Sequence, residues 1–250
     1  MGKRRIIVVF ATLLTAMLLI PAIAGDDFGM DYAIGIDKKL NQKMAVEVET
    51  EFRTRNDAKT ADRWSLGIEG SYKALPWLKL CWGYVFLYDH NHEKITYNPD
   101  GDYNNWRPSY WGTQHRFYIG ATASYDIGRL TLSLRERYQF THRPEAMTDR
   151  YDFDNVHWEE TTVRSKNKHV LRSRLEAEYN IRHCPVTPWV NVELFNDLSI
   201  DKTRLQIGAD YKMKKKHVLG IFYRFQDVNA RDDDNECNTH MVGLSYKYKL

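Results

Sequence analysis

The residues from Thr239 to Leu250 alternate without interruption between apolar and polar side chains. One face consists of His240, Val242, Leu244, Tyr246, Tyr248 and Leu250, and the other of Thr239, Met241, Gly243, Ser245, Lys247 and Lys249. A period of two is the signature of a β-strand with two different faces. A strand of this kind that runs to the last residue of an exported chain is typical of the closing strand of a transmembrane β-barrel. This feature therefore restricts the fold more than any other.

The start of the chain predicts export. The basic residues Lys3 to Arg5 precede an apolar run, Ile6 to Ile20, and the small residues of Ala22 to Ala24 follow. This is the order of a secretory signal peptide, which we predict to be residues 1–24, with cleavage before Gly25. The apolar run is shorter than the roughly 20 residues that a membrane-spanning helix needs.

The charge balance excludes one class of partner. Of the 36 Lys and Arg residues three lie in the leader, which leaves 33 against 33 Asp and Glu. No basic stripe remains, so nucleic acid is not an expected partner. The mean hydropathy of −0.59 excludes a helical membrane protein. A β-barrel satisfies this criterion because only every second residue of each strand faces lipid.

The region 25–250 is predicted to be one domain built from alternating strands. In one of them Val46, Val48 and Phe52 alternate with charged residues from Glu47 to Arg53. The connections are alternately short (75–77, 126–129, 183–188, 213–217) and long (56–62, 91–110, 142–168, 227–238), with a shorter polar one at 196–201. We therefore predict an all-β fold, an antiparallel transmembrane β-barrel with short periplasmic turns and long outer loops, in the bacterial outer membrane. A soluble barrel also alternates, but its apolar face would point inward.

The number of strands is less sharply determined. Ten strands follow from Met44 onward, and twelve is the second choice because bacterial single-chain barrels have even counts. The segment Asp31 to Lys38 is either accessory or one of two further strands, the other near Asp26 to Met30. Glu136 falls on the predicted lipid face, and a β-bulge that shifts the register there would turn it inward.

Several stretches of strand sequence resemble a known family. They are Thr187 to Phe195, Leu171 to Tyr179, His115 to Phe117 and Ile221 to Phe225. Together they resemble an uncharacterised family of single-barrel outer-membrane proteins, known only as a domain of unknown function. The resemblance implies an outer-membrane barrel of unassigned activity and transfers no catalytic residue.

The predicted inward face carries many charged residues, with Arg and carboxylate close to balance. They are Glu47, Glu49, Glu51, Arg53, Arg63, Glu69, Arg116, Arg135, Arg137, Arg172, Arg174, Glu176, Glu178, Glu193, Arg204, Asp210 and Arg224. Charges inside a protein must be paired or hydrated. The residues therefore favour a structural or binding barrel with a salt-bridged interior; the alternative is a narrow channel for small solutes. A pore for ions of one sign would show an excess of the other sign.

The long outer loops are the expected contact surface, because they are rich in aromatic residues with a polar group. The candidates are Tyr103, Trp106, Tyr110, Trp111 and Trp158. Expected partners are outer-membrane lipid and, during insertion, the barrel-assembly machinery. The sequence does not indicate a ligand.

A lipid-modifying enzyme is the remaining alternative. It would need a nucleophile and a base near the membrane edge, for which the candidates are Ser109, Ser124, Ser133 and Ser245 with His115 or His240. No nucleophile motif surrounds any of these serines, so no catalytic residue is predicted and an enzyme is not favoured. His90 and His92 provide too few ligands for a metal, and no metal or other cofactor is predicted.

Overall fold

The computed structural model describes residues 26–197, 200–214, 216–228 and 238–250. The predicted signal peptide and its cleavage site before Gly25 lie outside these residues. Throughout the described ranges the chain forms strands and turns only. No helix in them is long and apolar enough to cross a membrane.

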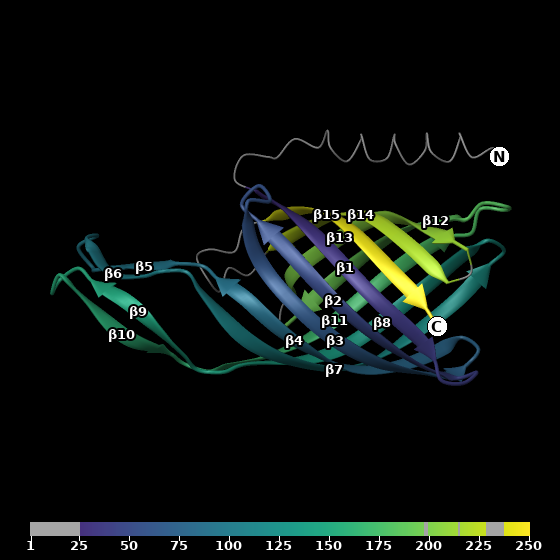
Figure 1. Cartoon of the computed structure of the whole chain (residues 1–250), viewed down its shortest axis with the longest axis horizontal. Coiled ribbons are helices and arrows are strands. Elements are labelled where there is room, and N and C mark those ends of the chain that lie inside the picture. Colours follow the sequence, from purple (N-terminus) through teal and green to yellow (C-terminus); the bar gives the residue numbers. More distant parts are fainter. Residues whose placement is uncertain (1–25, 198–199, 215, 229–237) are drawn as a thin grey trace.

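Strands form a closed barrel that contains most of the described chain (Figure 1). Its members are β1 (Asp27–Lys39), β2 (Met44–Arg55), β3 (Thr60–Leu75), β4 (Leu78–Asn91), β7 (Tyr110–Ile127), β8 (Leu130–Arg143), β11 (Lys166–Tyr179), β12 (Val186–Asn196), β13 (Ile200–Met213), β14 (His217–Val228) and β15 (Thr239–Lys249). Around the barrel they follow the order β1, β15, β14, β13, β12, β11, β8, β7, β4, β3, β2. The predicted all-β barrel is confirmed.

The barrel has eleven strands among the described residues, rather than ten or twelve, and it is not wholly antiparallel. β1 pairs with β2 in antiparallel fashion and with β15 in parallel, from Asp27 opposite Thr239 to Asp37 opposite Lys249. A ring in which successive strands reverse direction must contain one parallel pair if the number is odd. The segment Asp31 to Lys38 is thus part of a full barrel strand, and the suspected strand near Asp26 is the beginning of the same one.

The two ends of the barrel differ in their connections. At one end, called the short-turn end below, the strands are joined by residues 40–43, 76–77, 128–129, 180–185 and 214–216. In the two-residue turn 128–129, Gly128 has a φ of 64°, a value that glycine adopts without steric cost. At the other end, the connections predicted to be long at 91–110, 142–168 and 227–238 are long, whereas the one predicted at 56–62 is only residues 56–59, because β3 begins earlier than expected.

Two of the predicted long loops are folded as hairpins rather than irregular loops. They comprise β5 (Lys94–Tyr97) with β6 (Tyr103–Arg107) and β9 (Ala146–Asp152) with β10 (His157–Val163). These strands make a separate sheet in the order β10, β9, β6, β5, which projects beyond the barrel (Figure 1). We call it the extension sheet, and the end of the barrel that carries it the extension end.

The distribution of burial is the reverse of that in a soluble protein. Outward-facing apolar side chains are exposed, such as Ile34 (58%), Ile119 (64%) and Leu175 (53%), whereas the inward carboxylates of Asp31 and Glu193 are each 1% exposed. An apolar surface that surrounds a whole barrel far exceeds the patches that soluble proteins expose to water. The barrel therefore presents a belt suited to hydrocarbon around a polar interior.

Glu136 is the exception in this belt. The register of β8 with β7 and with β11 is continuous through this position, so the β-bulge that would have turned Glu136 inward is not formed. The carboxylate stays on the outer face and accepts a hydrogen bond of 2.7 Å from the Oγ of Ser173 on β11. A local hydrogen bond, rather than a change of register, accommodates this charge.

Candidate functional site

The interior of the barrel encloses a cavity of about 1460 Å³. All seventeen charged residues that the sequence places on the inward face line it. The lining extends from Lys94 and Tyr97 at the extension end to Lys212 and Lys249 at the short-turn end. One cavity therefore reaches both ends of the barrel.

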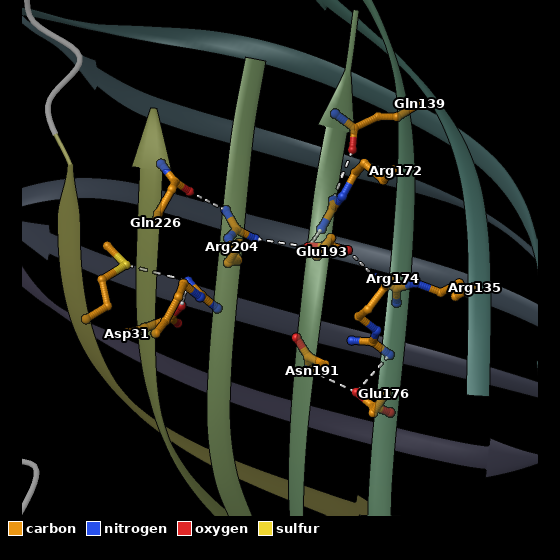
Figure 2. A network of polar contacts seen from close by, with 12 residues as sticks. Asp31, Arg135, Gln139, Arg172, Arg174, Glu176, Asn191, Glu193, Arg204 and Gln226 are labelled. Atoms are coloured by element: carbon orange, nitrogen blue, oxygen red, sulfur yellow. Dashed lines mark hydrogen bonds and ion pairs between the residues drawn. The ribbon is translucent and has the colours of Figure 1, made fainter. Parts of the chain in front are cut away.

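Glu193 on β12 organises one side of the cavity. Its carboxylate lies 2.7 Å from Arg135, 2.8 Å from Arg172 and 3.5 Å from Arg204, which come from β8, β11 and β13 (Figure 2). The three guanidinium groups converge because strand alternation turns each inward at a neighbouring position. One carboxylate thus contacts three cations and links four strands.

Further hydrogen bonds hold the arginines around Glu193 in place. Arg204 donates a hydrogen bond of 2.7 Å to Gln226, and Arg172 donates one of 3.2 Å to Gln139. Nearer the short-turn end, Glu176 lies 3.4 Å from Arg174 and accepts a hydrogen bond from Asn191 (Figure 2). Neutral amide side chains therefore provide hydrogen bonds where few carboxylates are available.

Asp31 plays the corresponding part on the other side of the cavity. It lies 2.8 Å from Arg224 and 3.3 Å from Arg53, and Arg53 also pairs with Glu51. Sequence reasoning missed Asp31 because it falls in the segment left outside the ten-strand count. The polar side of the alternation in that segment was the signal that would have found it.

Three more ion pairs connect neighbouring or nearby strands. Arg63 binds Asp89 through two nitrogen–oxygen contacts of 2.6 and 2.8 Å. Lys247 pairs with Glu47 at 2.5 Å. Glu69 accepts hydrogen bonds of 2.9 Å from both Arg137 and Tyr118. Asp89 and Lys247 were also absent from the predicted set, although both follow the inward phase of their strands.

The charges are separated around the barrel. We call one side the arginine wall; it is formed by Arg116, Arg135, Arg137, Arg172, Arg174 and Arg204, on β7, β8, β11 and β13. The carboxylate wall is formed by Asp31, Glu47, Glu49, Glu51, Glu69 and Asp89, on β1 to β4.

These two walls face each other. β2, which carries the row Glu47, Glu49 and Glu51, is five strands from β12 in one direction and five from β11 in the other. Counter-charges on each wall are fewer, with Glu193 and Glu176 on one and Arg53 and Arg63 on the other. Toward the short-turn end the separation weakens, since Glu178 and Asp210 lie on β11 and β13. The sequence shows the near balance of charge but not this separation.

The aromatic contact candidates fall into two groups. Tyr103, Trp106 and Trp158 lie on the extension sheet, where Trp106 contacts Trp158 with ring centroids 5.5 Å apart. Tyr110 and Trp111 instead begin β7, and Trp111 stacks on Tyr88 and His90 at the rim of the barrel. The second group is therefore part of the barrel wall and not of an outer loop.

The histidines considered for lipid chemistry have tyrosine partners. The Nδ1 of His115 lies 2.8 Å from the hydroxyl of Tyr84, and that of His240 lies 2.5 Å from the hydroxyl of Tyr223. The Nε2 of His240 lies 3.0 Å from Asp26. In the described part of the chain no serine is hydrogen-bonded to either histidine. The described residues also contain no cluster of three or more His, Cys, Asp or Glu side chains that could bind a metal ion.

Comparisons with solved structures yield barrels of low similarity. The beta domain of the Bordetella autotransporter Brka is 10% identical with a TM-score of 0.48, over 81% of this chain and 78% of that one. The NanC porin is 12% identical with a TM-score of 0.47, over 90% and 99%. The barrel architecture stands on the strand pairing above and not on these values. No curated protein matched the chain.

The comparison with protein families gives a firmer result. Residues 29–236, which include every barrel strand except β15 and the start of β1, match the family described as a protein of unknown function (DUF2490). The resemblance seen in the strand sequences is thereby confirmed. The chain belongs to the DUF2490 family.

Proposed function

We propose that the protein is a bacterial outer-membrane β-barrel whose lumen passes small polar solutes. The observation that carries this proposal is the single cavity of about 1460 Å³ with lining residues at both ends of the barrel. The sequence favoured a structural or binding barrel whose interior is filled by salt bridges. Such an interior would contain separate small voids between the charged side chains instead of one cavity.

The membrane location is supported by the exposed apolar belt and by the predicted signal peptide at 1–24. On this proposal the belt contacts outer-membrane lipid, and the barrel-assembly machinery inserts the chain. The short-turn end then faces the periplasm and the extension sheet stands outside the cell, the usual arrangement of turns in outer-membrane barrels.

The test is the conductance of the refolded full-length protein in planar lipid bilayers, with heat-modifiable migration in gels as proof of folding. We expect steady single-channel steps. The variant Gly67→Trp places a bulky side chain in the lumen and should reduce the size of these conductance steps. It should still fold, because a Cβ at this inward position lies 3.4 Å from its nearest neighbour, Val85, which is an ordinary contact distance.

The matched control places the same side chain on the outer face. Ile207 is 48% exposed in the apolar belt, so Ile207→Trp should leave the conductance unchanged. A folded protein without conductance would overturn the proposal and favour a sealed structural barrel.

A further inference from the structure

Of the twelve residues that form the arginine wall and the carboxylate wall, two have no counter-ion in the described part of the chain. The Nε of Arg116 donates a weak hydrogen bond of 3.3 Å to the hydroxyl of Thr141. No carboxylate among the described residues lies within ion-pair distance of its guanidinium group. Glu49, in the middle of the carboxylate row on β2, forms neither an ion pair nor a hydrogen bond through its side chain with any described residue. Both side chains line the cavity.

The surrounding pattern sets these two residues apart. Arg135, Arg172 and Arg204 are held by Glu193, whereas Asp31 is held by Arg53 and Arg224. These paired charges link strands and stabilise the barrel. A charge without a partner must instead be hydrated, because an unpaired ion is costly to remove from water. Arg116 and Glu49 line the cavity, which is the space in which water or a polar solute would contact them.

The two residues belong to walls of opposite charge, on strands that are three steps apart around the barrel. Arg116 extends the arginine wall on β7, and Glu49 lies at the centre of the carboxylate wall on β2. A simple ion would be attracted by one wall and repelled by the other. A solute that carries both an anionic and a cationic group can satisfy both walls at once, because each group lies near the wall of opposite sign.

We propose that the lumen prefers zwitterionic solutes, with a carboxylate directed to Arg116 and an ammonium group directed to Glu49. This inference rests on the proposed function, since it names the class of solute that the channel would pass.

The test compares two uncharged-overall solutes of similar size in a liposome-swelling assay with the full-length protein. The zwitterion is γ-aminobutyrate and the neutral solute is erythritol. We expect γ-aminobutyrate to enter about two- to fivefold faster than erythritol, the gain that charge contacts in a hydrated site provide. Arg116→Gln and Glu49→Gln should each bring this ratio close to one. Neither change breaks an ion pair, so both variants should fold.

The controls make the same chemical changes outside the lumen. They are Arg129→Gln in a turn at the short-turn end and Glu160→Gln on the extension sheet, both of which should keep the wild-type ratio. A ratio near one in the wild type, or a wild-type ratio in both lumen variants, would overturn the zwitterion preference while leaving a working channel. Entry of neither solute, together with absent conductance, would overturn the proposed function itself.

Discussion

Replacement of Glu193 by glutamine removes one negative charge from a cluster of three arginines. The side chain of Glu193 is 2% exposed, and those of Arg135, Arg172 and Arg204 are 14%, 14% and 12% exposed. Removal of one partner from a buried ion pair costs about 3–5 kcal/mol, chiefly because the remaining charge is left uncompensated. The slight exposure of the guanidinium groups to the cavity places the expected loss at the lower end, about 3 kcal/mol.

The assay is equilibrium unfolding by denaturant in lipid vesicles, followed by tryptophan fluorescence and by heat-modifiable migration. Glu178→Gln serves as the control, because this exposed lumen residue forms no ion pair in the described part of the chain. We expect it to change the free energy of unfolding by less than about 0.5 kcal/mol.

A second variant separates lost charge from lost packing. If uncompensated cations cause the loss, adding Arg135→Gln to Glu193→Gln should recover part of the stability, so that the two changes are not additive. If Glu193→Gln unfolds at the same denaturant concentration as the wild type, the cluster is hydrated and the reasoning fails.

The remaining predictions concern the outer face, the wall and one histidine. Glu136→Leu should stabilise the barrel in vesicles by up to about 2 kcal/mol, since a lipid-facing carboxylate is unfavourable but less so than Lys or Arg; equal unfolding midpoints would contradict this. Gly83→Ala should destabilise by about 1–3 kcal/mol, because a Cβ there meets an aromatic ring and a backbone carbonyl on the adjacent strands, whereas Gly67→Ala should be tolerated. The pKa of His92, which follows β4, is lowered by burial and then by the nearby charge of Arg55. Its neutral form is therefore favoured by folding, so stability should fall as pH drops below about 6.5, and His92→Gln should reduce that pH dependence in unfolding experiments.

Strand alternation makes the faces of the barrel predictable from the sequence. Once a segment such as Glu47 to Arg53 is recognised as a strand, its period of two fixes which side chains point inward. All seventeen predicted inward charges accordingly line the cavity. Hydrophobicity on one side and charge on the other are local properties, and they can be read without knowledge of the partner strands.

The closure of the barrel is not a local property. β1 pairs with β15 across more than two hundred residues of sequence, and nothing in Asp27 to Lys39 shows that its neighbour is parallel. The identity of ion pairs depends on the same information. Glu193 meets arginines from three other strands, and the separation of charge into two walls appears only when β2 is placed halfway around from β11 and β12.

The extension sheet was not predicted from the sequence, for a different reason. Its strands are short, and β5 has only four residues, which is too few to establish a period. Their polar flanks and the neighbouring Gly101 favour a loop on the usual sequence criteria. Pairing between β6 and β9, which lie in separate hairpins, assembles them into one sheet.

The parallel pairing of β1 with β15 also limits how the chain could be rearranged. Asp27 and Lys249 lie at opposite ends of the seam, ten residue steps apart in the register, or about 33 Å. In a barrel with an even number of strands a tight turn could join the two edge strands and give a circular permutant. Here such a linker would need about ten extended residues and would have to cross the membrane through the lumen or along the lipid. The two edge strands therefore cannot be joined without obstructing the cavity or exposing unpaired backbone to hydrocarbon.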